Sequence, residues 1–222
     1  MGIPKNMYWV LRHGKSIPNE KGLIVSSLQN GVLPEFELST DGIEQARSAG
    51  RQFLHELASA NLPISSVLIC YSPFSRAKRT ANEVSSILGI DFNGPQCKMM
   101  EDIRERFFGP SMELHSHDRY AEIWALDERD PLVPPPGGES VYDVASRMSA
   151  ILDAIESEFE GRAVLIVSHG DPLQILQTIM DAANFRSFGN DFAASIESVK
   201  TSTVLSRHRN FALCTGELRR LV

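Results

Sequence analysis

Short, almost wholly apolar segments alternate along this chain with longer segments whose apolar residues recur at helical spacing. The apolar segments span residues 7–11, 66–71 and 163–167, with a weaker one at 98–103. The helical spacing spans residues 41–60, 76–88, 141–159 and a stretch that begins near Asp171. Strands that are apolar on both faces are typical of a parallel sheet covered by helices on both sides. The pattern therefore predicts an α/β fold in which residues 1–222 form a single domain, a three-layer sandwich around a mainly parallel central sheet.

Three segments lack this alternation. Residues 15–38 are rich in Gly, Pro, Asn and Ser and are predicted to form a long loop. Residues 107–138 end in three consecutive prolines and two glycines, and they are too long for an ordinary connection, which favours a variable lid or substrate-binding segment. Near the end of the chain, residues 201–207 and 211–214 are predicted to form a hairpin around Asn210.

Charge and cysteine content exclude several classes of protein. The chain has 22 basic and 28 acidic residues, and the basic ones are scattered, so nucleic-acid binding is not expected. No apolar run approaches the ~20 residues that cross a bilayer, and the N-terminal residues lack the pattern of a signal peptide, so neither a membrane span nor secretion is expected. Cys70, Cys97 and Cys214 lie far apart in sequence and are expected to be reduced, buried thiols. These features predict a cytoplasmic protein.

Basic and imidazole side chains follow three of the predicted strands. Arg12 and His13 follow the strand at 7–11, Arg76 follows the strand at 66–71, and His169 follows the strand at 163–167. Because ligands of parallel sheets bind beyond the carboxyl ends of the strands, these side chains are expected to converge. Guanidinium groups bind phosphate oxygens in pairs and keep their charge, so the sequence predicts a phosphate pocket. A simpler alternative for Arg76 is an ion pair with an acidic residue of the helix at 41–60.

Phosphate chemistry at such an edge needs a nucleophile and an acid. A neutral imidazole can attack phosphorus and form a covalent phosphohistidine, which divides one displacement into two easier ones. The leaving oxygen then needs a proton, and we assign this role to Glu105, although Glu101 and Asp102 lie close by. A free imidazole has a pKa of ~6.5, so the rate should fall on acidification, at a pH lowered by the neighbouring arginines.

Five ordered blocks carry a resemblance to a known family. They are residues 11–16 (LRHGKS) with Asn19, 38–46 (LSTDGIEQA), 71–81 (YSPFSRAKRTA), 136–140 (PGGES) and 167–170 (VSHG). Arg-His-Gly alone is a weak signal, but the five blocks in this order resemble the histidine phosphatase superfamily, whose fold is that of phosphoglycerate mutase.

The resemblance implies a role for each matching position. His13 would be the phosphorylated nucleophile, and Arg12, Arg76 and His169 would hold the phosphate oxygens. Asn19, Ser16 and the Gly170 backbone would complete the pocket, and Glu105 would be the acid and base. No metal and no organic cofactor is expected, and the partner is a small phosphorylated substrate.

Two activities and a binding role remain open within this resemblance. A mutase must exclude water from the phosphohistidine, and glycolytic mutases typically carry a longer insertion between the acid and the second histidine than the one between Glu105 and His169. The shorter span favours a phosphomonoester hydrolase. Arg106 matches a mutase position that binds the remote acidic group of the substrate, but a surface ion pair with Glu105 or Asp102 is an equal alternative. A non-catalytic phosphate sensor is the third candidate.

Three other patterns point elsewhere. Cys70 and Arg76 have the Cys-x5-Arg spacing of thiol phosphatases, but the segment between them has no glycine, and burial should raise the thiol pKa. His115 and His117 resemble metal ligands without a partner motif. Four aromatic residues of the 107–138 segment either line a pocket for an apolar substrate or anchor a short helix to the core: Phe107, Phe108, Tyr120 and Trp124.

Overall fold

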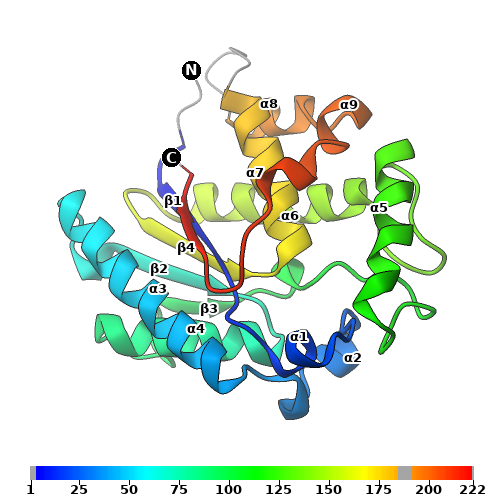
Figure 1. Ribbon diagram of the computed structural model, residues 1–222. Coiled ribbons are helices and arrows are strands. Elements are labelled where there is room, and N and C mark those ends of the chain that lie inside the picture. Colours follow the sequence, from blue (N-terminus) through cyan, green and yellow to red (C-terminus); the bar gives the residue numbers. More distant parts are fainter. Residues whose placement is uncertain (1–3, 185–191, 222) are drawn as a thin grey trace.

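The computed structural model describes residues 4–184 and 192–221, and a five-stranded sheet forms its centre (Figure 1). The strand order is β3-β2-β4-β1-β5. The strands are β1 (Met7–Arg12), β2 (Val67–Tyr71), β3 (Cys97–Met99), β4 (Ala163–Ser168) and β5 (Leu218–Arg220). Neighbouring strands pair in parallel except β5, which runs antiparallel to β1. The predicted single-domain α/β fold with a mainly parallel sheet is confirmed.

The two faces of the sheet bury alternate residues of the same strands. In β1, Tyr8 and Val10 face one hydrophobic cluster, and Trp9 and Leu11 face the other. All five residues of β2 and all six of β4 are buried. This two-sided burial is the reason that the strands are apolar throughout rather than alternating.

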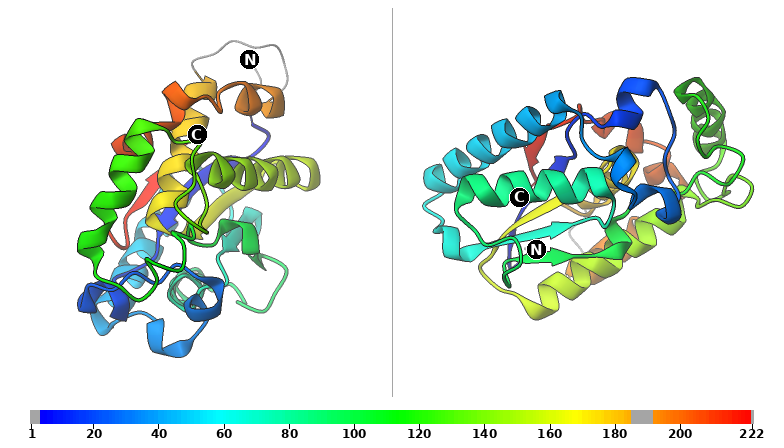
Figure 2. Two further views of the ribbon diagram at one scale, coloured as in Figure 1. Left: turned by 90° about the vertical axis from the view of Figure 1, so that its right-hand side faces the viewer. Right: turned by 90° about the horizontal axis from the view of Figure 1, so that it is seen from below.

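Helices cover both faces, as the view from below shows in Figure 2. On one face lie α3 (Thr40–Ser59) and α4 (Ser75–Leu88), and on the other lie α6 (Val141–Glu158) and α7 (Gly170–Asn184). The long helices α3 and α6 begin at serine caps, Ser39 and Ser140, whose side chains accept hydrogen bonds from backbone N–H groups of the first turn. No helix in the described ranges is both long and apolar enough to cross a membrane.

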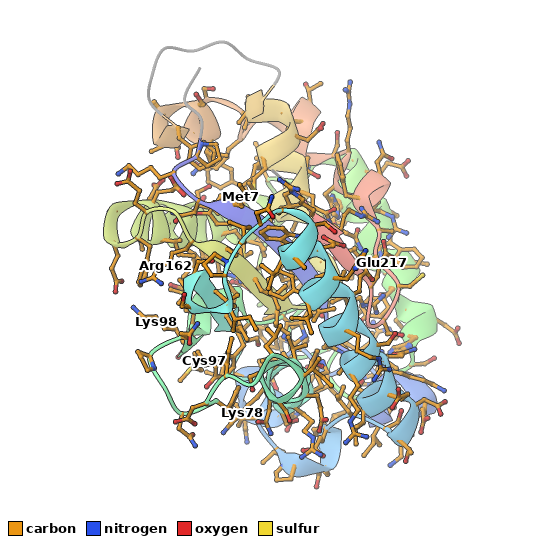
Figure 3. The ribbon with its side chains drawn as sticks, turned by 90° about the vertical axis from the view of Figure 1, so that its left-hand side faces the viewer. Met7, Lys78, Cys97, Lys98, Arg162 and Glu217 are labelled. Atoms are coloured by element: carbon orange, nitrogen blue, oxygen red, sulfur yellow. The ribbon has the colours of Figure 1, made fainter. Side chains whose placement is uncertain are left out.

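The parallel strands place their amino and carboxyl ends at opposite edges of the sheet. Met7 begins β1 and pairs with Ala163, the first residue of β4, next to Arg162, and Figure 3 labels Met7 and Arg162 at this edge. At the other edge, Arg12 pairs with Ser168. The residues that follow these two positions, His13 and His169, therefore emerge side by side.

Two segments predicted to be irregular contain short helices. The predicted loop at 15–38 holds α1 (Ile17–Lys21), α2 (Leu28–Gly31) and the 3-10 turn η1 (Pro34–Phe36). The 107–138 segment holds the 3-10 turn η4 (His117–Arg119) and α5 (Tyr120–Arg129). Helices of four or five residues are too short to show an apolar period, and the glycines and prolines of the second segment lie at its two ends, outside η4 and α5.

The C-terminal prediction is wrong. In place of a hairpin, the chain forms α8 (Phe192–Ser198), α9 (Ser202–Leu205) and the 3-10 turn η5 (His208–Phe211) before the edge strand β5. The predicted strand at 201–207 rests on Thr and Val, whose strand preference depends on context. Cys214, expected to be buried there, is exposed, whereas Cys70 is buried and Cys97 is half-buried, and all three thiols are free.

Candidate active site

A cavity of about 360 Å³ opens at the carboxyl edge of the sheet. Its lining includes side chains that follow three different strands, among them Arg12, His13 and Arg76, and also Glu105, which comes after β3 and the 3-10 turn η3 (Glu101–Ile103). This volume lies at the lower end of the range of ~300–1,000 Å³ for small-molecule sites. The geometry suits a small ligand.

His13 is held in one tautomer. Its ring is buried, with 2% of the residue exposed, and Nδ1 lies 2.7 Å from the Gly14 carbonyl oxygen. A carbonyl only accepts, so Nδ1 carries the proton and Nε2 carries the lone pair. Nε2 in turn accepts a hydrogen bond of 3.1 Å from Arg76 Nε. Burial, followed by the charges of Arg76 and Arg12, lowers the His13 pKa well below its usual value, so the ring stays neutral.

The loop that carries His13 packs against the first turn of α3 through two glycines. A Cβ on Gly14 would overlap the backbone of Gly42, and a Cβ on Gly42 would overlap the backbone of Lys15. Ser39 also donates two hydrogen bonds to the Lys15 carbonyl, 2.9 Å from its N–H and 3.0 Å from its hydroxyl. Ser39 and Gly42 of the second sequence block therefore fix the position of the loop that carries His13.

Gly42→Ala should destabilise the protein and impair activity together. The new methyl group meets backbone atoms that cannot rotate away, so the free energy of unfolding should fall by about 1–3 kcal/mol. Urea denaturation measures this change. Ser48→Ala, at an exposed position of the same helix, is the control and should change stability by less than about 0.5 kcal/mol. A Gly42→Ala protein as stable as the wild type would show that the contact is not tight.

Three buried nitrogens around His13 have no hydrogen-bond partner among the described residues. They are Arg12 Nε, Arg76 Nη1 and His169 Nδ1. Each buried polar group without a hydrogen-bond partner costs about 1–3 kcal/mol of folding free energy. These three nitrogens are therefore available to bind a ligand that accepts hydrogen bonds. Their other atoms are anchored, since Arg12 Nη1 donates to the Leu213 carbonyl at 2.6 Å and Arg76 Nη2 donates to the Val25 carbonyl at 3.0 Å. Together they form an anion site beside His13 Nε2.

Ser72 orients the second histidine. The His169 ring lies edge-on to the His13 ring, with centroids 5.0 Å apart, and its Nε2 is 2.8 Å from Ser72 Oγ. When the Ser72 hydroxyl donates to Nε2, the proton of His169 resides on the unpartnered Nδ1, which is then a donor for an anion. Burial and the charge of Arg76 lower the His169 pKa well below its usual value.

Glu105 lies opposite, within reach of the same atoms. Its Oε2 is 3.9 Å from Arg76 Nη2 and 3.9 Å from His169 Nδ1, and its Oε1 accepts a hydrogen bond from the Arg106 N–H at 2.9 Å. Burial, reinforced by the Asp171 carboxylate and opposed by Arg76, raises the Glu105 pKa to about 7. A carboxyl group with this pKa is populated in both protonation states near neutrality.

Three further predicted residues line the cavity in different ways. Ser16 and Asn19 cap α1 reciprocally, because the Ser16 hydroxyl oxygen accepts from the Asn19 N–H at 3.3 Å and Asn19 Oδ1 accepts from the Ser16 N–H at 3.0 Å. The Ser16 hydroxyl also donates to Asn19 Oδ1 at 2.8 Å. The Ser16 hydroxyl is thus engaged in the cap, while the Asn19 side-chain amide nitrogen is not part of it. Gly170 begins α7, where a Cβ would lie 3.7 Å from the Arg12 guanidinium, so this helix terminus faces the anion site.

Arg106 is not brought into the cavity lining. Its side chain is fully buried and forms a two-pronged ion pair with Asp127, at 2.7 and 2.8 Å, and a third contact with Asp171 at 3.1 Å. The alternative of a surface ion pair with Glu105 or Asp102 is therefore wrong. The sequence offers no signal for these partners, because Asp127 lies on α5 and Asp171 on α7.

The Arg106→Leu variant should be much less stable than the wild type. Removing one member of a buried ion pair leaves two carboxylates without compensation, and we expect a loss of about 3–5 kcal/mol in the free energy of unfolding. Thermal and urea denaturation measure it. Arg51→Ala removes an exposed pair with Glu44 and should cost less than about 1 kcal/mol. Equal losses in the two variants would show that the Arg106 pair is not desolvated.

The alternative sites receive no support from the geometry. Burial raises the pKa of the Cys70 thiol to about 12, which leaves it unreactive as a nucleophile. His115 is exposed, and His117 Nε2 lies 2.6 Å from the Leu23 carbonyl oxygen. One group of Asp127, Asp171 and His208 atoms within 4.8 Å exists in the described chain, but the Arg106 guanidinium already binds both of its carboxylates.

Sequence reasoning missed two residues of the site. The sequence pattern gives no role to Ser72, which follows the predicted strand at 66–71, or to Asp171, at the start of a predicted helix, yet Ser72 bonds His169 and Asp171 lines the cavity. Their positions carried a usable signal. Each follows the carboxyl end of a parallel strand within three residues, as His13 and His169 do.

Comparisons with known proteins identify the family of this chain. The profile of the histidine phosphatase superfamily (branch 1) matches residues 8–203. A 2,3-bisphosphoglycerate-dependent phosphoglycerate mutase of Chelativorans sp. (strain BNC1) is 30% identical over 183 residues, covering 78% of this chain and 80% of that protein. A mutase of the same name from Methylobacterium sp. (strain 4-46) is 31% identical over 180 residues, covering 77% and 78%.

Solved structures with the same fold carry phosphatase names. Phosphoserine phosphatase of Entamoeba histolytica superposes with a TM-score of 0.65 at 17% identity, covering 96% of this chain and 88% of that one. A mycobacterial glucosyl-3-phosphoglycerate phosphatase superposes with a TM-score of 0.63 at 22% identity, covering 85% and 86%. At these identities the likeness establishes the fold.

Proposed function

The chain belongs to the histidine phosphatase superfamily, and on that premise we propose that it hydrolyses phosphomonoesters through a covalent phosphohistidine on His13. The observation that carries the proposal is the set of three buried, unpartnered nitrogens around the unprotonated His13 Nε2. A phosphoryl group seated there would receive hydrogen bonds on its oxygens while its phosphorus faces a neutral nucleophile. The charge it carries is met by two guanidinium groups, so the chemistry needs no metal ion.

The first half-reaction transfers the phosphoryl group to the protein. His13 Nε2 attacks phosphorus in line with the ester oxygen, so that an N–P bond forms as the P–O bond breaks. The electron pair leaves with the oxygen, which takes a proton from neutral Glu105. For this attack Arg76 Nε must release the Nε2 lone pair to which it donates, and its guanidinium then turns to the phosphoryl oxygens.

The second half-reaction returns the protein to its starting state. A water molecule attacks phosphorus and gives a proton to the Glu105 carboxylate, and the N–P electron pair returns to Nε2 as inorganic phosphate leaves. A Glu105 pKa of about 7 serves both halves, because the group must be protonated in one and ionised in the other.

A mutase is the second candidate, since the relatives at about 30% identity carry that name. The state of Arg106 favours hydrolysis. In mutases of this family the matching position binds the acidic group of the substrate, whereas here the Arg106 guanidinium is fully buried and bound to Asp127 and Asp171. A phosphoglycerate would therefore lack that contact.

One assay separates the candidates. The purified protein is incubated in EDTA with p-nitrophenyl phosphate, and separately with 3-phosphoglycerate and 2,3-bisphosphoglycerate, while released phosphate and newly formed 2-phosphoglycerate are measured. We expect phosphate release without isomerisation. Isomerisation faster than phosphate release would establish the mutase, and loss of activity in EDTA would contradict metal independence. Binding without turnover of any ester would establish a phosphate sensor.

The proposed substrate is a small phosphorylated metabolite in the cytoplasm. Support for the compartment comes from three free thiols, which persist in reducing surroundings.

A further inference from the structure

A stack of aromatic rings stands beside the phosphate site. Tyr120 and Trp124 lie one turn apart on α5 with their rings parallel within 7° and centroids 6.1 Å apart. Phe108 meets Tyr120 edge-on, with centroids 5.3 Å apart. These three rings line the cavity that contains His13, whereas Phe107 does not.

The position of Trp124 is not explained by packing of the core. The part of α5 that is buried packs through Ile123 into a small cluster with Ile24, Phe108 and Met112, separate from the clusters on the two faces of the sheet. Trp124 is outside that cluster and remains 41% exposed at the cavity. A large apolar ring left exposed in a cavity that Leu23 and Val25 also line indicates a surface that a ligand covers.

The charged side chains of the outer cavity supply no net positive charge to bind an anionic leaving group. Apart from Arg12 and Arg76, Arg209 is the one arginine or lysine among the residues that line it, and its guanidinium lies over the Trp124 ring, 3.7 Å from the centroid. The same lining carries two carboxyl groups, Glu105 and Asp171. Glu105 belongs to the phosphate site, so the outer part of a leaving group with a carboxylate or a second phosphate would meet one exposed cation, Arg209, and one carboxylate, Asp171. A flat, uncharged ring would instead meet aromatic and aliphatic surface.

We propose that this cavity selects phosphomonoesters whose leaving group carries a flat aromatic ring, with Trp124 and Tyr120 as its contact surface. The inference rests on the proposed hydrolysis and names the substrate class of the same site. The aromatic ring lies against α5 while the phosphoryl group occupies the nitrogens around His13. Specificity thus comes from the 107–138 segment and chemistry from the strand ends.

Three alkyl esters with primary alcohols as leaving groups test the proposal, because P–O cleavage makes similar demands in each. They are benzyl phosphate, cyclohexylmethyl phosphate, which has the same size without a flat ring, and glycerol 1-phosphate. The kcat/KM for benzyl phosphate should exceed that for glycerol 1-phosphate by ~10-fold or more and that for cyclohexylmethyl phosphate by ~3-fold or more. Equal values for benzyl and glycerol esters, or for benzyl and cyclohexylmethyl esters, would overturn the proposal.

Substitution of the ring locates the contact. Trp124→Ala should reduce the ratio of kcat/KM for benzyl phosphate to that for glycerol 1-phosphate by ~3- to 10-fold. Tyr142→Ala is the matched control, because Tyr142 is an aromatic residue with 37% exposure that does not line this cavity. It should leave the ratio unchanged. A ratio that is unaltered in Trp124→Ala, or that falls equally in both variants, would contradict the assignment.

Failure of this inference is distinguishable from failure of the proposed function. p-Nitrophenyl phosphate and glycerol 1-phosphate report hydrolysis itself. If both are hydrolysed while benzyl phosphate is not preferred, hydrolysis stands and the aromatic selectivity is wrong. If none of the esters is hydrolysed, the proposed function is wrong and the inference is wrong with it.

Discussion

His13→Ala should lose turnover by at least ~10⁴-fold, the scale seen when a covalent nucleophile is removed. The remaining side chains would still bind the phosphoryl group, so KM should change much less than kcat. The measurement is phosphate release from p-nitrophenyl phosphate under saturating conditions. His13→Gln, which fills more of the space left by the buried ring, should show the same loss and guards against an effect of misfolding. His55→Ala, at an exposed position of α3, is the control and should retain full activity.

The covalent intermediate gives a direct test of the same assignment. Wild-type protein quenched in alkali after mixing with ³²P-labelled ester should carry label in the peptide that contains His13. The adduct should be stable in alkali and decompose in acid, as expected of a phosphorus–nitrogen bond. An adduct that survives acid, or label on the peptide that contains Cys70, would contradict the phosphohistidine.

The position of His13 could be predicted because strand ends are visible in the sequence. A run such as Tyr8-Trp9-Val10-Leu11 is apolar on both faces, and both faces are buried. Any reactive residue directly after such a run is delivered to the carboxyl edge, and this holds for His13 and His169. The convergence of their rings, with centroids 5.0 Å apart, follows from β1 and β4 being neighbours in the sheet.

The partners of Arg106 could not be predicted, and the reason is physical. Asp127 lies on a ten-residue helix whose buried face is narrow, and the carboxylate is buried only because Arg106 neutralises it. Local sequence does not show that two charged residues far apart in the chain will meet and be buried together. It therefore favours an ion pair between exposed residues that are close in sequence. The strand β5 was missed for a related reason, since three residues at an edge show no period.

The sequence predicts that the rate falls at acidic pH as His13 becomes protonated, and the burial of the ring alters this prediction. Neutral His13 was expected to titrate near the ordinary imidazole pKa, moderately lowered by arginines. Burial is the larger cause, and it lowers the pKa of both His13 and His169 well below that value. Both rings therefore stay neutral as the pH falls through ~6.5, and kcat/KM should not decline there on their account.

The pH dependence is instead governed by Glu105, whose pKa of about 7 sets where the acid is lost. The first half-reaction needs the protonated carboxyl, so for an alkyl ester kcat/KM should be high below this pH and fall about tenfold per pH unit above it. p-Nitrophenyl phosphate releases a stabilised anion that needs no proton, so its kcat/KM should not show this decline. Two pH profiles on the same preparation measure the difference.

Glu105→Gln should remove the decline of kcat/KM at alkaline pH and also most of the activity on alkyl esters. Loss of a general acid typically costs ~10²–10⁴-fold, and we expect a loss in this range for benzyl phosphate but only a small change in kcat/KM for p-nitrophenyl phosphate. Glu101→Gln, at an exposed position four residues earlier, is the matched control and should leave both values unchanged. An equal loss for both esters, or a decline at alkaline pH that persists in Glu105→Gln, would move the acid to another group. Asp171 would then be the first candidate, because it is the other carboxyl group that lines the cavity.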